Sequence, residues 1–195
     1  MTHPARTILG VSGSLRRESH NTALLRNAAR LLPGGVRLEL WEPDALKAIP
    51  PYDQDDDVDG QPDAVTALRQ AMERADAVLF STPEYNSSIP GQLKNALDWV
   101  SRPVADSPLR NKPVAVIGAS TGAFGAVWAQ AELRKVLGSL GARVTEGELA
   151  VGHAHERIDP EGLLADADQL EQLEAVVADL IRQAELRERL AVSAA

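Results

Sequence analysis

Residues 7–21 read Thr7-Ile8-Leu9-Gly10-Val11-Ser12-Gly13-Ser14-Leu15-Arg16-Arg17-Glu18-Ser19-His20-Asn21. The first five residues form a short apolar run, which is typical of a strand buried in a sheet. A turn rich in hydroxyl groups follows. From about Asn21 onward, apolar residues recur at the three- and four-residue spacing of a buried helix face. The stretch therefore predicts a strand, a polar turn and a helix, which together begin a parallel strand–helix–strand unit.

The same alternation continues along the chain. The run at 36–41 alternates polar and apolar residues, as an edge strand with one wetter face does, whereas 77–81 is almost continuously apolar and should be covered on both faces. Five such units predict one α/β domain over residues 1–195, a doubly wound parallel sheet with helices on both faces and a frayed tail beyond about Arg187. Strands are expected at 7–11, 36–41, 77–81, 113–118 and, more weakly, from 142 to about 151; helices are expected at about 21–32, 63–74, 91–100 and 126–140, and from near Pro160 onward.

The composition excludes several functions. The 195 residues carry 20 basic and 28 acidic side chains, and the net charge of −8 argues against broad nucleic-acid binding. Because the chain has no cysteine, disulfides, thiolate catalysis, iron–sulfur clusters and thiolate zinc sites are excluded. No apolar run approaches the roughly 20 residues of a membrane span, and residues 1–6 lack the apolar stretch of a signal peptide. We therefore expect no membrane association and a cytoplasmic location.

In a doubly wound sheet, ligands bind beyond the carboxyl ends of the strands, where the strand order reverses. The loop after the first strand offers hydroxyl groups, Arg16 and the free N–H groups of a helix N-terminus, which suit one compact phosphate monoester. It contains neither the GxxxxGK[ST] pattern of a triphosphate loop nor the GxGxxG pattern of a dinucleotide loop. The alternative is that Ser19 and Asn21 only cap the helix.

The loops after the third and fourth strands suit a flat ligand. Two prolines, Pro83 and Pro90, stiffen the former, which presents backbone amides and Tyr85. Small residues and two glycines at 119–126 would let the backbone approach a ligand closely. In the loop after the third strand, Tyr85 and Trp99 could instead simply pack against the protein. In the loop after the fourth strand, a tight strand-to-helix turn would have the same composition.

Two motifs are specific. They are Gly13-Ser14-Leu15-Arg16 with Ser19 and Asn21, and the longer, more specific Pro83-Glu84-Tyr85-Asn86, Ser88, Pro90-Gly91, Leu93-Lys94-Asn95-Ala96 and Asp98-Trp99. These motifs resemble the NADPH-dependent FMN reductase family, which includes quinone, azo-dye and chromate reductases. The resemblance covers about residues 6–185 and implies a flavodoxin-like fold with five strands in the order 2-1-3-4-5. Residues 51–55 are also similar to the family's loop after strand two, whereas Gly125-Ala126 replaces a frequent double glycine.

The resemblance implies a bound FMN, with NAD(P)H as co-substrate and a small-molecule electron acceptor. The flavin would carry the two-electron, ping-pong hydride chemistry, so we nominate no catalytic side chain and no metal ligand. The family's usual assembly implies a homodimer or homotetramer, with the helix that begins at Gly91 and carries Trp99 as a candidate contact surface. The phosphate would be held by Ser14, Arg16, Ser19, His20 and Asn21; the ring and ribityl chain would be lined by Pro83, Glu84, Tyr85 and Asn86; and Ser120, Gly122 and Gly125 would approach the ribityl chain or pyrimidine edge.

Other functions fit parts of the sequence less well. A flavodoxin-type electron carrier without its own NAD(P)H turnover is the main alternative. A serine hydrolase would use Ser120, because residues 118–122 match GxSxG and two histidines, His153 and His155, follow. That interpretation lacks an oxyanion loop of the HGGG type and leaves the loop at 14–21 unused. Residues 55–60 copy the first half of an EF-hand, but Thr66 replaces the final glutamate, so a solvated acidic loop is favoured over calcium.

Overall fold

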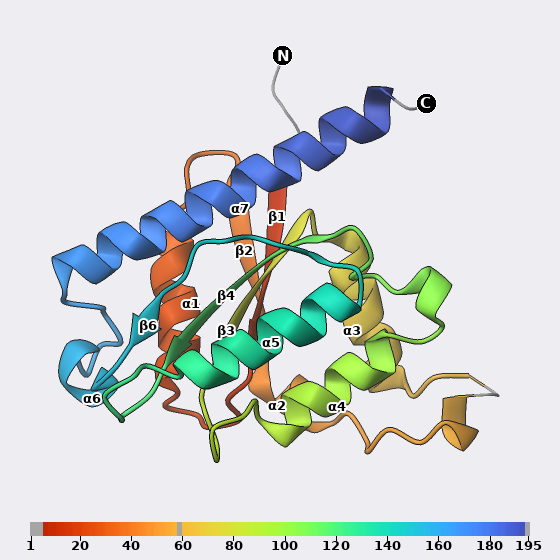
Figure 1. Cartoon of the computed structure of the whole chain (residues 1–195), viewed down its shortest axis with the longest axis horizontal. Helices are drawn as coiled ribbons and strands as arrows, with labels where there is room; N and C mark the ends of the chain where they lie inside the picture. The colour runs from red at the N-terminus through yellow and green to blue at the C-terminus, as the bar shows by residue number, and fades with distance from the viewer. Residues whose placement is uncertain (1–5, 58–59, 194–195) are drawn as a thin grey trace.

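The computed structural model describes residues 6–57 and 60–193, and its centre is one parallel sheet (Figure 1). The strands pair in the order β2-β1-β3-β4-β5, and β6 also pairs with β4. The predicted order and the edge position of the 36–41 strand are therefore confirmed. The strands are β1 (Arg6–Ser12), β2 (Val36–Trp41), β3 (Ala77–Thr82), β4 (Pro113–Ala119), β5 (Arg143–Val144) and β6 (Ala150–Val151).

Helices cover both faces of the sheet because alternate strand residues point to opposite sides. Val78 and Val116 belong to an apolar core that also contains residues of α3, α4 and α5. Leu79 and Ile117 belong to a second core with residues of α1 and α7, and Figure 1 shows these two helix layers on either side of the strands. The helices are α1 (His20–Arg30), α2 (Pro43–Lys47), α3 (Asp63–Arg74), α4 (Gly91–Val100), α5 (Val127–Ser139), α6 (Ala154–Arg157) and α7 (Ala167–Ser193), with 3₁₀ turns at Asp55–Asp57 and Val104–Asp106.

The last part of the sheet differs from the expectation of one weak strand from 142 to about 151. It consists of two short pieces, β5 and β6, and the chain between them leaves the sheet. Arg134 of α5 occupies this break, where its guanidinium donates to the carbonyl oxygens of Thr145 (2.6 Å), Gly147 (2.5 Å) and Val116 (3.2 Å). Burial lowers the pKa of Arg134, an effect that Glu148 partly offsets. The arginine thus replaces strand pairing with side-chain hydrogen bonds.

The final helix begins at Ala167 and not near Pro160, so that sequence prediction is wrong. The residues before it form an irregular loop with a bridge between Ile158 and Leu164. Asn27 of α1 holds this loop, because its Nδ2 donates to the carbonyl oxygen of Gly162 (2.8 Å) and its Oδ1 accepts from the Leu164 amide (3.1 Å). The segment before Ala167 has a helical pattern of leucines, but its contacts with Asn27 of α1 hold it in a loop.

Helix α7 continues to Ser193 and so includes part of the segment beyond about Arg187, whose fraying stays a prediction. Arg6, at the start of β1, pairs with Glu185 (3.1 Å) and Glu188 (2.6 Å) of this helix. These ion pairs join the last turns of α7 to the sheet. Within the described residues, no helix is long and apolar enough to cross a membrane.

Trp99 of α4 is fully buried, and the helix as a contact surface between copies stays a prediction. Its Nε1 donates to the carbonyl oxygen of Pro50 (2.9 Å), and its ring packs edge-on against Tyr52 with centroids 5.0 Å apart. Asn95 bonds the same segment, because its Nδ2 donates to the Pro50 oxygen (2.7 Å) and its Oδ1 accepts from the Tyr52 amide (2.7 Å). These motif residues therefore attach the chain after β2 to α4.

Lys112 is a buried cation directly before β4, at the opposite end of the sheet from the loops described below. Its Nζ donates to the carbonyl oxygens of Ala75 (2.5 Å) and Glu73 (3.3 Å). Burial, reinforced by repulsion from Arg187, lowers the pKa of Lys112 to about 8, although Asp76 and Glu73 act in the opposite direction.

This lowered pKa predicts a stability that rises at alkaline pH. Between pH 8 and 10.5, the folded protein has released the Lys112 proton while the unfolded chain retains it. Unfolding then takes up a proton, so the free energy of unfolding increases with pH across this window, by about 2 kcal/mol. Urea denaturation at pH 7.5 and pH 10 measures the increase, and Lys112→Met should remove it. An equal pH dependence in the wild type and the variant would contradict the assignment.

Candidate functional site

The carboxyl ends of β1, β3 and β4 bring three loops together around a cavity of about 100 Å³. Nine of the twelve residues nominated from the sequence line it, and the remaining three, Asn86, Gly122 and Gly125, do not. Ala119 and Thr121 were missed, although each is next to the nominated Ser120. The lining residues are Ser14, Arg16, Ser19, His20, Asn21, Pro83, Glu84, Tyr85, Ala119, Ser120 and Thr121.

Two buried hydroxyl groups shape the loop after β1. Ser14 Oγ accepts from the Arg16 amide (3.4 Å), and Ser19 Oγ, at the N-cap of α1, accepts from the Thr22 amide (3.2 Å). A hydroxyl that accepts from the backbone can still donate its own hydrogen. Ser19 therefore caps α1, as the alternative interpretation predicted. The hydroxyl groups of Ser19 and Ser14 can nevertheless donate to a ligand, because both residues line the cavity.

Asn21 is held by the neighbouring strands. Its Nδ2 donates to the carbonyl oxygen of Ala119 (2.9 Å), and its Oδ1 accepts from the Ala119 amide (3.0 Å) and from Ser81 Oγ (2.9 Å). The side chain is buried. It connects the start of α1 to the ends of β3 and β4, so it fixes how the three loops lie relative to one another.

Arg16 supplies the positive charge at this cavity. Burial is the largest of the causes that lower the pKa of His20, followed by the charges of Arg16 and His155. His20 is consequently neutral at pH 7, and the charged group beside the N-terminus of α1 is the exposed guanidinium of Arg16. Free N–H groups, a helix dipole and one arginine together make a site for an anion.

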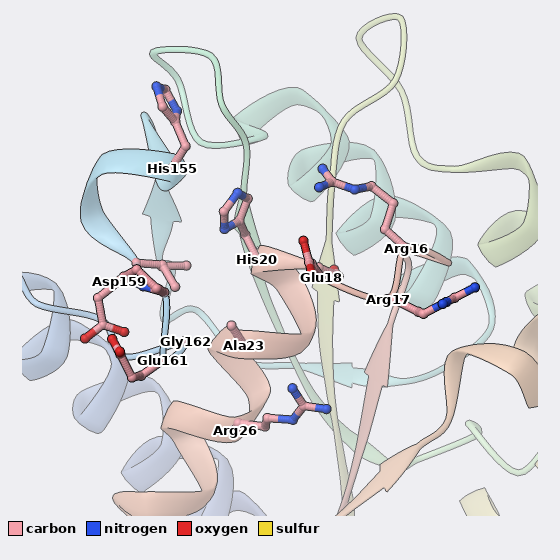
Figure 2. Close-up of a pocket in the computed structure, with 13 residues that line it drawn as sticks. Arg16, Arg17, Glu18, His20, Ala23, Arg26, His155, Asp159, Glu161 and Gly162 are labelled. Atoms are coloured by element: carbon pink, nitrogen blue, oxygen red, sulfur yellow. The ribbon is translucent and has the colours of Figure 1, made fainter.

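A wider hollow of about 410 Å³ lies between α1 and residues 155–162 (Figure 2). Arg17 points away from His155 and Asp159 in this view, whereas the guanidinium of Arg16 turns toward the side on which His20 lies. The lining contains three arginines and three carboxylates, so its formal charges cancel. The charged lining residues are Arg16, Arg17, Arg26, Glu18, Asp159 and Glu161.

The loop after β3 ends in a tight turn. The amide and carbonyl groups of Tyr85 and Ser88 bond each other in both directions at 3.1 Å, and the two residues between them, Asn86 and Ser87, have φ of 52° and 60°. Two consecutive left-handed residues define a type I′ turn, in which asparagine is favoured. Asn86 is therefore at the tip of the turn, whereas Tyr85, 50% exposed, lies at its base beside the cavity.

The two nominated glycines of the third loop differ. Gly125 has φ of 60°, and an added Cβ would lie 2.4 Å from the carbonyl carbon of Ala150, so this glycine is required by packing against β6. Gly122 has open space, with Ser120 Oγ at 3.7 Å as its nearest neighbour. Gly152 was missed by sequence reasoning: its Cβ would lie 2.1 Å from the carbonyl oxygen of Ala123.

The hydrolase and metal interpretations gain no support from the geometry. Ser120 Oγ donates to the carbonyl oxygen of Gly122 (3.3 Å) in its own turn. His153 packs its ring against His155, with centroids 6.4 Å apart. Among residues 6–57 and 60–193, no group of three or more histidines and carboxylates is placed to hold a metal. Asp59 of the EF-hand-like segment lies outside the described residues.

Several known proteins are similar to this chain. Residues 6–156 match the family described as NADPH-dependent FMN reductase. The chain is 43% identical to the NAD(P)H-dependent FMN reductase PA1204 of Pseudomonas aeruginosa over 160 residues, 82% of this chain and 84% of that protein. It is 40% identical to 2-hydroxy-1,4-benzoquinone reductase of a Burkholderia species over 165 residues, 84% and 88% of the two chains. The solved structure of FerB, a flavoenzyme NAD(P)H:(acceptor) oxidoreductase from Paracoccus denitrificans, is similar with a TM-score of 0.83 and 33% identity, covering 93% of this chain and 98% of that one.

Proposed function

This chain belongs to the NADPH-dependent FMN reductase family, and we propose that it transfers two electrons from NAD(P)H through FMN to a quinone or a similar small-molecule acceptor. One observation carries the proposal: the Arg16 side chain, two buried hydroxyl groups and the N-terminus of α1 converge on one cavity at the carboxyl edge of the sheet. That edge is where doubly wound sheets bind nucleotides.

The chemistry of the cavity fits the phosphate end of FMN. Ser14 and Ser19 would donate hydroxyl hydrogens to phosphate oxygens, and Arg16 would neutralise the charge. A volume of about 100 Å³ suits a phosphate but not a tricyclic ring. The ring would therefore lie over the open side of the cavity, bordered by the exposed ring of Tyr85 and by Gly122, which leaves space there.

The protein's part in the reaction is to bind and orient. When bound, FMN supplies the hydride chemistry between NAD(P)H and the acceptor. Asn21 acts indirectly, by holding the three loops in register through Ala119 and Ser81. The backbone of 83–85 and of 119–121 would border the flavin from two sides, and Tyr85 would border the acceptor. We therefore propose no acid–base pair.

Arg16→Ala is expected to weaken FMN binding by about 1.5–3 kcal/mol, or roughly 10- to 150-fold, because a charged hydrogen bond to the phosphate is lost. Titration of apoprotein with FMN, followed by flavin fluorescence, measures the dissociation constant. Arg17→Ala is the matched control, since Arg17 lines the wider hollow and not the cavity. Equal dissociation constants for the wild type and Arg16→Ala would remove Arg16 from the site.

Steady-state oxidation of NADPH and NADH in the presence of 1,4-benzoquinone tests the function directly. We expect FMN-dependent turnover with parallel-line kinetics, as a two-step exchange through one site requires. A protein that binds FMN, oxidises neither nucleotide and accumulates a stable one-electron-reduced form would instead be an electron carrier. Protein that is folded but takes up no FMN would refute both functions.

We also propose that the chain acts as a homodimer or homotetramer in the cytoplasm. Two exposed aromatic side chains support the assembly: Phe124 is 63% exposed and Trp128 is 51% exposed, and their rings pack edge-on with centroids 5.1 Å apart. Single exposed aromatics are common, but an adjacent pair favours a contact with another molecule. Light scattering of the holoprotein after size exclusion measures the oligomeric state, and a monomer at micromolar concentration would contradict the proposal.

A further inference from the structure

Glu84 links two loops of the site that are distant in sequence. Its Oε2 accepts from the backbone amides of Trp128 and Ala129, both at 3.1 Å. These are among the first amides of α5, which have no partner within the helix. Ala126, at the N-cap of α5, has no side chain that could accept them. The carboxylate of Glu84 therefore performs the capping of α5 from the loop after β3, where a negative charge is also favoured by the helix dipole.

A second glutamate makes the reciprocal contact. Oε2 of Glu132, which lies one turn further along α5, accepts from the backbone amide of Ile89 at 3.3 Å. One bond thus runs from the loop to the helix, and the other from the helix to the loop. Together they hold the segment from Glu84 to Ile89 against α5 at both of its ends.

These contacts tie the loop of Tyr85, which lines the cavity, to the start of α5, where Trp128 lies. Tyr85 directly follows Glu84 and is half exposed. Trp128 donates its backbone amide hydrogen to Glu84. Its side chain is half exposed and packs against Phe124. One carboxylate therefore fixes the loop that carries Tyr85 relative to the start of α5, where Trp128 packs against Phe124.

We propose that Glu84 is a positioning residue for the acceptor: by capping α5 it sets the gap between Tyr85 and the Phe124–Trp128 pair, through which a planar aromatic acceptor enters. The inference rests on the proposed function for its substrate, a quinone-like ring. It assigns Glu84 a role in binding the second substrate that is separate from lining the flavin. Flat apolar rings gain from aromatic walls held at a fixed spacing.

Two variants separate position from charge. Glu84→Gln keeps an oxygen that can accept both amides and removes the charge, whereas Glu84→Ala removes the contact. Glu171→Ala, on the exposed side of α7 and so on the opposite face of the sheet, is the matched control. Hydrogen exchange is measured on each apoprotein, and steady-state kinetics are measured with saturating FMN and NADPH and varied 1,4-benzoquinone.

In Glu84→Ala we expect the amides of 128 and 129 and of residues 85–89 to exchange at least tenfold faster. The KM for benzoquinone should rise about tenfold while kcat changes less than twofold. Glu84→Gln should behave as the wild type in both measurements, and this rescue distinguishes contact from charge. The proposal is overturned by unchanged exchange in Glu84→Ala, by an equal rise of KM in both variants, or by a fall in kcat at constant KM.

The positioning role of Glu84 and the proposed function of the protein can be refuted separately. Amide exchange needs neither FMN nor turnover, so it decides whether Glu84 holds the loop against α5 even in an inactive protein. A wild type without NADPH oxidation refutes the proposed function and, with it, the role assigned toward the acceptor. Normal turnover combined with faster exchange and an unchanged KM refutes the positioning role alone.

Discussion

Gly125→Ala is expected to destabilise the folded protein by about 3 kcal/mol or more. The residue has φ of 60°, a conformation that costs an L-residue about 1–2 kcal/mol. The added Cβ would also lie 2.4 Å from the Ala150 carbonyl carbon and 2.6 Å from the Val151 amide nitrogen. Backbone atoms cannot rotate away as a side chain can, so β6 would have to shift, which adds about 1–3 kcal/mol of overpacking.

Gly122→Ala is the matched control in the same loop. Its Cβ would meet only Ser120 Oγ, at 3.7 Å, so stability should change by less than about 0.5 kcal/mol. Urea denaturation of the two apoproteins measures both values. Similar losses in the two variants, or a Gly125→Ala protein as stable as the wild type, would show that the close contact with β6 is wrong.

Asn21→Ala is expected to cost about 3–4 kcal/mol of stability. The change leaves three groups without their partner: the amide and carbonyl of Ala119 and the hydroxyl of Ser81. Each unpaired buried polar group costs about 1 kcal/mol or more. Ser81→Ala removes only one of the three bonds and serves as the graded control, with an expected loss of about 1 kcal/mol.

The same variant separates two roles for Asn21. If its amide positions the loops, the apoprotein loses stability in urea denaturation before any ligand is added. If it served mainly as a phosphate ligand, the apoprotein would keep its stability and only the FMN dissociation constant would rise. The hydrogen bonds to β3 and β4 predict the first result.

Most of the fold could be predicted because it depends on local patterns. Alternation at 36–41 and the apolar run at 77–81 located the edge strand and a central strand, and the helix at 91–100 was predicted with its observed bounds. The failures lie where a distant residue overrides the pattern. Arg134 interrupts the expected strand between 144 and 150, and Asn27 holds the leucine-rich segment before Ala167 out of the helix.

The family relationship and the sheet order were determined by the sequence alone, since motifs within short segments carry them, and the nucleotide site expected after β1, β3 and β4 stays a prediction. The role of individual site residues was not determined in this way. Gly122 and Gly125 are the same amino acid in one loop, yet only β6 makes the second indispensable. Asn21 and Glu84 depend on partners 98 and 44 residues away. A side chain's function depends on the atoms it contacts, and only the folded chain brings those atoms to it.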